Sequence, residues 1–196
     1  LLSYTSYEQC IANASVDNDD IVCGECIVLS ASGNTGSSVF TEDFNGGVPT
    51  GWAFTQSADY SNPCSGFGAD GTTHMWMGSG SGNPRSAETN PYNLSTGGTI
   101  CFDMQYAVQG GVSPCEGPDE PDEGVSLQYS IDGGATWVDI AYYHPNGSTL
   151  VSNPGGNTPT ISGATTFTTW GTYNVAIPPA AVTTNTIFRW VQTNSS

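Results

Sequence analysis

Residues 123–137 read EGVSLQYSIDGGATW, and this stretch decides the fold class. Apolar and polar side chains alternate from Val125 to Ser130, which is the period of a strand with one face on a core. The Asp-Gly-Gly sequence that follows is typical of a tight hairpin turn, and a second strand-like run starts at Trp137. The stretch therefore predicts two antiparallel strands joined by a short turn.

The same alternation recurs along the chain, while no segment has convincing helical periodicity. The clearest run is 100–108, in which one face is apolar (Ile100, Phe102, Met104, Tyr106 and Val108) and the other carries Cys101, Asp103 and Gln105. Further short runs lie at 39–44, 52–55, 75–77, 167–170, 173–177 and 186–191. About nine strands at this spacing predict an all-β fold, a β-sandwich.

The charge of the chain is strongly one-sided. Its 196 residues include 18 Asp and Glu but only 2 Lys and Arg, so the formal net charge is -16. The two cations are Arg85 and Arg189, and we expect both to form partly buried structural pairs with carboxylates or carbonyl oxygens. Because no basic patch can neutralise phosphates or anionic headgroups, the composition argues against nucleic acid and direct membrane contact as partners.

Residues 1–38 differ from the rest of the chain. An acidic polar stretch is followed by Cys23-Gly24-Glu25-Cys26, a short strand-like run and a Ser/Gly linker. We interpret 1–38 as the edge of a preceding module and 39–196 as the main domain. The chain has no initiator Met and no membrane-spanning run, so it is expected to be a soluble piece of a longer protein.

The six cysteines fit an oxidising, extracellular setting. Their spacing alone cannot choose among the 15 connectivities that six cysteines allow. Cys23 and Cys26 have the spacing of a redox or zinc site, but no second ligand pair and no following helix accompany them. A tight structural disulfide between Cys23 and Cys26 is therefore favoured.

Ser130, Asp132, Gly134 and Trp137 fit the Asp-box pattern S-x-D-x-G-x-x-W. The carboxylate of Asp132 is expected to bind amides of the turn, and Trp137 is expected to pack the hairpin onto the sheet. Asp-boxes occur in sialidases, but a sialidase needs an arginine cluster to hold a sugar carboxylate, which this chain lacks. The pattern is thus predicted to be structural.

Other candidate chemistry is limited to acidic residues. Glu42 and Asp43 are plausible calcium ligands, with simple exposure at a strand end as the alternative. The long acidic loop at 110–124 is either solvated or cation-binding, because nothing apolar beside it would raise the pKa of one carboxyl for acid catalysis. His74 and His144 have no metal-ligand spacing, and no nucleophile motif is present, so catalysis is not expected.

The motifs from residue 40 onward resemble the reelin-repeat type of jelly-roll module. The resemblance is carried by FTEDF at 40–44, Gly51-Trp52, Cys64, Arg85, Cys115, the string at 123–137, and FRWVQ at 188–192. It implies a two-sheet jelly roll over 39–196, a disulfide between Cys64 and Cys115, and a calcium site near Glu42 and Asp43. Compared with the family pattern, the sequence is expected to lack the last strand of the module. The resemblance does not indicate a disulfide partner for Cys10 or Cys101.

The N-terminal string CGECIVLSAS at 23–32 resembles the opening strand of Ig-like repeats in very large surface proteins of gliding bacteria. These proteins, the SprB-type gliding adhesins among them, are exported by the type IX secretion system. The resemblance implies that 1–38 is part of an Ig-like repeat and that the protein lies at the cell surface.

Together these observations predict a non-catalytic, calcium-stabilised module of an extracellular adhesin, acting as spacer and contact surface. Its partners would be neighbouring repeats of the same chain, surface glycans or other cell-surface proteins. One alternative is a carbohydrate-binding module, with Trp76, Tyr142, Tyr143 and Trp170 as the candidate aromatic platform. Another is an accessory domain of a secreted hydrolase.

Overall fold

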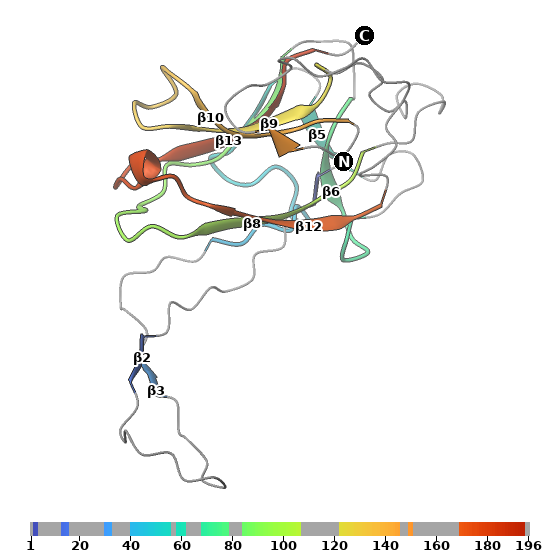
Figure 1. The fold of residues 1–196 in the computed structure, drawn as a ribbon. Coiled ribbons are helices and arrows are strands. Elements are labelled where there is room, and N and C mark those ends of the chain that lie inside the picture. Colours follow the sequence, from blue (N-terminus) through green and yellow to red (C-terminus); the bar gives the residue numbers. More distant parts are fainter. Residues whose placement is uncertain are drawn as a thin grey trace, which may run out of the picture.

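The computed structural model describes residues 2–3, 13–15, 30–32, 40–55, 58–61, 68–78, 84–106, 122–145, 149–150 and 169–194 of the chain. In these segments the regular structure is almost all strand, with one 3-10 turn, η2 (Pro179–Ala181). Figure 1 shows two sheets lying face to face. The all-β sandwich predicted from the alternating runs is confirmed.

The first sheet has five strands in the order β12-β8-β1-β6-β5, and all neighbours are antiparallel. Strand β8, whose apolar alternation is the longest in the chain, pairs with β12 on one side and β1 on the other. The strands are β12 (Gly171–Ala176), β8 (Thr99–Met104), β1 (Leu2–Ser3), β6 (His74–Met77) and β5 (Ala58–Ser61).

The second sheet has six strands in the order β11-β10-β9-β13-β7-β4, again antiparallel. Strands β9 and β10 are the hairpin predicted from residues 123–137. The strands are β11 (Thr149–Leu150), β10 (Val138–Tyr143), β9 (Val125–Ser130), β13 (Ile187–Gln192), β7 (Arg85–Glu88) and β4 (Ala53–Thr55).

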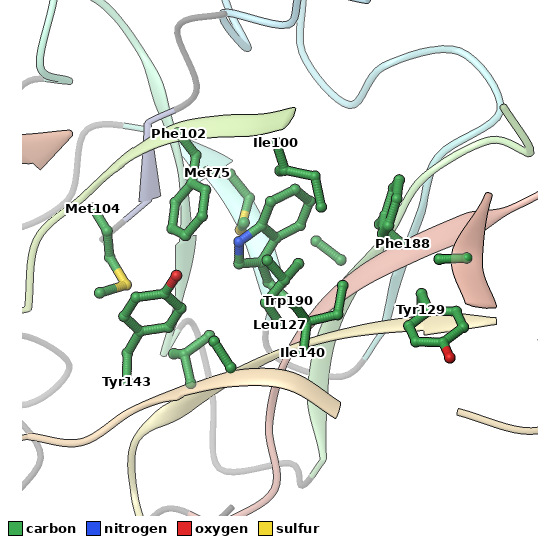
Figure 2. Packing of buried hydrophobic residues seen from close by; sticks show 14 of the residues in the cluster. Met75, Ile100, Phe102, Met104, Leu127, Tyr129, Ile140, Tyr143, Phe188 and Trp190 are labelled. Atoms are coloured by element: carbon green, nitrogen blue, oxygen red, sulfur yellow. The ribbon is translucent and has the colours of Figure 1, made fainter. Parts of the chain in front are cut away.

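The core lies between the two sheets and is rich in aromatic rings (Figure 2). Trp190 of β13 stacks on Trp52, with ring centroids 6.2 Å apart, and meets Phe102 edge-on at 5.5 Å. Ile100, Phe102 and Met104 of β8 are buried in this cluster, as the alternation predicts. Large rings stabilise the sandwich because each removes much apolar surface from water.

Two buried tyrosines fix the start of β9. The hydroxyl of Tyr106 donates to the carbonyl of Tyr143 and accepts the N–H of Val125 at 3.0 Å. The hydroxyl of Tyr142 accepts the N–H of Gly124 at 2.8 Å. Burial raises the pKa of both tyrosines, so each hydroxyl keeps its proton at neutral pH. The hairpin is therefore held to the opposite sheet where it begins.

One of the predicted strands is wrong. Residues 40–44 form no strand, because the carboxylates of Glu42 and Asp43 bind backbone N–H groups and turn the chain, and Phe44 has φ of 58°. For the strand predicted over 167–170, residues 167 and 168 lie outside the described residues, and Trp170 lies just before β12. The short strands β5 and β7 were missed, since their sequences do not alternate clearly.

The N-terminal residues divide between two sheets. Leu2 and Ser3 form β1, which pairs with both β6 and β8 inside the sandwich, although the sequence assigned them to a preceding module. Strands β2 (Asn13–Ser15) and β3 (Ser30–Ser32) form a separate two-stranded sheet. For the rest of the chain the boundary between 1–38 and 39–196 stays a prediction, as does the Ig-like character of 1–38.

Candidate functional site

The Asp132 hairpin, residues 130–137, is closed by side-chain hydrogen bonds. Oδ1 of Asp132 accepts the hydroxyl of Ser130 at 2.7 Å and the N–H of Thr136 at 2.9 Å, and Oδ2 accepts the Thr136 hydroxyl at 2.6 Å. The hydroxyl oxygen of Ser130 accepts the N–H of Gly134 at 2.9 Å. These bonds lower the pKa of Asp132 to about 2. The carboxylate is thus occupied by its own turn.

Trp137 at the end of this hairpin lies against Arg189 of the neighbouring strand β13. The guanidinium carbon is 4.0 Å from the centre of the Trp137 ring, a cation–π contact. Nε of Arg189 donates to Gln128 at 2.7 Å, and its NH1 is 3.6 Å from Glu88. Gln128 in turn donates to Asp139 at 2.7 Å. The result is a polar ladder across four strands, which carry Asp139, Gln128, Arg189 and Glu88.

Arg85, at the start of β7, is also engaged inside the molecule. Its NH1 donates to the amide oxygen of Gln192 at 3.0 Å, and Gln192 donates to the carbonyl of Glu123 at 2.7 Å. Burial lowers the pKa of Arg85, and the charge of Glu123 opposes that shift. The prediction that both arginines are partly buried and structural is confirmed.

The Glu42–Asp43 turn, residues 42–45, uses its carboxylates differently. One oxygen of Glu42 accepts the N–H of Phe44 at 2.7 Å, and one oxygen of Asp43 accepts the N–H of Asn45 at 2.9 Å. Asp43 is exposed and Glu42 is half-buried. Burial raises the pKa of Glu42, and the charge of Asp43 adds to that rise. The two carboxylates therefore repel each other and each keeps one oxygen outside these two bonds.

A second acidic turn abuts the first. The exposed Asp70 accepts both the N–H of Thr72, at 2.9 Å, and the hydroxyl of Thr72, at 2.5 Å. The next residue, Thr73, donates its N–H to Oδ1 of Asn45 at 3.2 Å. The order of the loops thus brings Asp70 into the segment that contacts the Glu42–Asp43 turn.

These residues fit a calcium ion only in part. Calcium takes 6–8 oxygen ligands, and carboxylate oxygens that repel each other are suitable ones. Within the described segments, however, no group of three or more Asp, Glu, His or Cys side chains is placed to hold a metal. Glu42 and Asp43 could supply two carboxylates, and backbone carbonyls and water would have to complete the shell.

The aromatic platform suggested for carbohydrate binding is not formed. Trp76, Tyr142 and Tyr143 are buried, because alternate positions of β6 and β10 face packed side chains on both sides of their sheets. Trp170 is half-buried and packs edge-on against His74, with ring centroids 5.6 Å apart. The large aromatic side chains that are exposed in the described segments are Phe40 and Tyr60.

Both histidines, His74 and His144, are fully buried. Burial lowers the pKa of His74 to about 4, so this side chain is neutral at pH 7. Together with the half-buried arginines, this leaves no exposed cationic side chain among Arg85, Arg189, His74 and His144. Since the chain has no lysine, these four are all its basic side chains.

Most of the cysteine predictions lie outside the described residues. This holds for the pair Cys64 and Cys115 and for the pair Cys23 and Cys26, so both disulfides stay predictions. Cys101 is described, and it is buried on β8 on the face opposite Phe102. The acidic loop at 110–121 also lies outside the described residues.

Sequence reasoning missed Gln128 and Glu88 as partners of Arg189. A signal was present in the alternation of β9, which places Gln128 on the face away from Leu127 and Tyr129. It was insufficient because only the strand order, with β13 between β9 and β7, brings Gln128 and Glu88 to the two sides of Arg189.

Comparison with known protein families gives one match. Residues 58–196 match the family Reelin subrepeat B, which covers most of the chain and every strand from β5 onward. Reelin repeats are non-enzymatic structural or adhesion-type domains typical of extracellular proteins. None of the described residues forms a helix long and apolar enough to cross a membrane. With its two antiparallel sheets and the matched span, the chain belongs to the Reelin subrepeat B family.

Proposed function

We propose that this chain is a non-catalytic extracellular adhesion module that acts as a spacer and contact surface within a longer protein. The observation that carries the proposal is the match to a family of structural and adhesion-type domains over residues 58–196. The described residues agree with it, because the titratable groups with strong pKa shifts serve turns and packing rather than a shared cleft.

The distribution of charge supports a contact role governed by cations. Both arginines bind groups of their own domain, and exposed ionisable carboxylates such as Asp43, Asp70 and Asp122 have no exposed cationic side chain to balance them. A net charge of -16 keeps copies of the domain apart and soluble. Contacts with neighbouring repeats or other surface proteins would then need either cationic partners or bridging cations.

We further propose that calcium stabilises the module through Glu42 and Asp43. The ion would supply positive charge beside two neighbouring carboxylates, Glu42 and Asp43, and it would stiffen the 40–51 segment. That segment is followed directly by Trp52, which stacks on Trp190 of the core. A more ordered turn would therefore also stabilise the packing of Trp52 on the core. Free calcium at ten times the Kd of the site would add about 1.4 kcal/mol to the free energy of unfolding.

The experiment is a thermal melt of the purified chain in calcium and in chelator. Wild type is compared with the double variant Glu42→Gln/Asp43→Asn, and Asp132→Asn serves as the matched control in the other acidic turn. We expect calcium to raise the Tm of wild type by a few degrees, to have no effect on the double variant, and to act normally on Asp132→Asn.

Three outcomes would change the calcium proposal. Equal melting temperatures of wild type in calcium and in chelator would remove the site. A calcium shift that persists in the double variant would move the site to other carboxylates, first those of the acidic loop at 110–124. Loss of the shift in Asp132→Asn alone would place the ion at the Asp132 hairpin.

A finer proposal concerns the parent protein. The string at 23–32 resembles Ig-like repeats of SprB-type surface proteins, which favours a bacterial cell-surface adhesin exported by the type IX system and used in gliding. The test is the gene that encodes the chain. A reading frame of thousands of residues with repeated modules would support this proposal, whereas a short frame with a hydrolase domain would contradict it.

A further inference from the structure

Asn45 and Gly46 form one of two Asn-Gly pairs in the chain, and the other, at 146–147, lies outside the described residues. An asparagine side chain loses ammonia when the backbone nitrogen of the next residue attacks its carbonyl carbon. Glycine permits this attack best, because it has no side chain to hinder the approach and its backbone is the most flexible.

The surroundings of Gly46 leave room for that attack. Asn45 and Gly46 are both exposed, and a Cβ built on Gly46 would meet no atom within 4 Å. The pair sits at the tip of a turn closed by the N–H of Gly47, which donates to the carbonyl of Phe44 at 3.2 Å. Water can therefore reach both reacting groups.

The structure also polarises the amide that would react. The N–H of Thr73 donates to Oδ1 of Asn45 at 3.2 Å, from a turn 28 residues away in sequence. A fixed backbone donor at this oxygen stabilises the negative charge that develops on it when the carbonyl carbon is attacked. On the other side, Asp43 accepts the N–H of Asn45 at 2.9 Å and holds the residue in place.

We propose that Asn45 is a site of spontaneous deamidation in the folded protein. The nitrogen of Gly46 bonds to Cγ of Asn45, gives up its proton and displaces the side-chain nitrogen, which leaves as ammonia from a cyclic imide. Water then opens the imide at either carbonyl, which yields aspartate or isoaspartate at residue 45. The net reaction consumes one water and releases one ammonia, with no oxidant or reductant.

The product places a third carboxylate beside Glu42 and Asp43. Aspartate keeps the backbone and its oxygens can still accept the N–H of Thr73, so the turn gains charge with little change in shape. Isoaspartate lengthens the backbone by one carbon, which changes the spacing between Phe44 and Gly47. Either product makes the Glu42–Asp43 turn more negative by one unit.

The experiment follows the purified protein at pH 8 and 37 °C by peptide mapping and mass spectrometry. The probe is the mass of the peptide that contains residue 45, which rises by one unit on deamidation, with separation of the aspartate and isoaspartate forms. A synthetic peptide covering 40–49 gives the rate without the fold. We expect Asn45 in the folded protein to react at least as fast as in the peptide.

The chain supplies its own controls. Asn174 is exposed but is followed by Val175, whose branched side chain hinders attack, and Asn90 precedes Pro91, whose nitrogen has no proton to lose. Both should stay intact. The variant Gly46→Ala should slow the reaction at residue 45 several-fold without loss of stability, because the space around Gly46 is open and its φ is not positive.

The result that overturns the proposal is an intact Asn45 in the folded protein under conditions in which the peptide reacts. An equal rate in Gly46→Ala and wild type would also overturn it, because the attack by Gly46 would then not be limiting. These readouts are independent of calcium, so they stand whatever the thermal melts give.

Discussion

The Asp132 hairpin and the 40–51 segment both contain acidic turns, but their carboxylates differ in the hydrogen bonds that they accept and in the direction of their pKa shifts. Asp132 receives three hydrogen bonds from Ser130 and Thr136, and its pKa falls to about 2. Glu42 receives one bond from a backbone N–H, and burial beside Asp43 raises its pKa. A carboxylate saturated by its own turn is structural, whereas one left partly unsatisfied is available to a cation or a partner.

The two regions also differ in how tightly their glycines are enclosed. Gly51 and Gly133 both have positive φ, 83° and 75°, but a Cβ on Gly51 would lie 2.0 Å from Oδ1 of Asn90, whereas a Cβ on Gly133 would meet nothing within 4 Å. Asn90 cannot move without loss of its 2.8 Å bond to the carbonyl of Thr50. The 40–51 segment is thus bound closely to the sandwich behind its acidic turn.

The largest expected effect tests this difference. Gly51→Ala should lower the free energy of unfolding by about 3 kcal/mol, from backbone strain and the lost Asn90 bond. Gly133→Ala has the same strain without the clash and should cost about 1 kcal/mol. Urea denaturation of both variants measures the two values. Equal costs would mean that the segment is not held against Asn90.

A smaller effect is expected at Arg189, which connects the Asp132 hairpin to the ladder. Arg189→Met keeps much of the length of the side chain but removes the contact with Glu88, the bond to Gln128 and the cation–π contact with Trp137, and should cost about 2 kcal/mol. Arg85→Met removes the hydrogen bond to Gln192 and involves no cation–π contact with Trp137, so it is the matched control with a lower cost. A cost for Arg189→Met no larger than that of the control would contradict the ladder.

The sequence predicted the sandwich well because its strands alternate strongly. Val125 to Ser130 is a strand from end to end as predicted, and the apolar positions of 100–106 all face the core. Alternation reports which side chains face a core, and a strand with one buried face cannot avoid it. The class of the fold was therefore readable without any partner strand being known.

The predictions from the sequence were wrong where polar side chains, rather than apolar ones, determine the conformation of the backbone. The run at 39–44 contains Phe40 and Phe44 and resembles a strand, yet the carboxylates of Glu42 and Asp43 bind the next backbone N–H groups and make a turn. Likewise, Tyr142 and Tyr143 look like a platform but are both buried, one on each face of the sheet. Neither the local hydrogen bonds of such a turn nor the burial of the outer face of a sheet produces a periodic pattern of apolar residues in the sequence.

The smallest expected effect is the dependence of stability on pH, and it has opposite signs in the two regions. The pKa of Asp132 is lower in the folded chain, so its contribution is present above about pH 3.8, its ordinary pKa, and is lost as pH falls toward about 2. The pKa of Glu42 is higher in the folded chain, so its contribution is present at low pH and is lost as pH rises above 4.5.

Difference curves separate these contributions from the rest of the protein. Tm is measured from pH 2 to pH 7 for wild type, Asp132→Asn and Glu42→Gln. The Tm of each variant is then subtracted from the Tm of wild type at the same pH. The subtraction removes the effect of His74, which titrates between pH 6.5 and about 4 in all three proteins. We expect the Asp132→Asn difference to shrink as pH falls from 3.8 toward about 2, because the unfolded wild-type chain takes up the Asp132 proton at a higher pH than the folded chain does. The Glu42→Gln difference should instead move in favour of the variant as pH rises above 4.5, since only wild type then holds a charged, half-buried carboxylate beside Asp43. Curves of the same sign would mean that the two acidic turns are equivalent, and the contrast on which a cation at Glu42 and Asp43 rests would be lost.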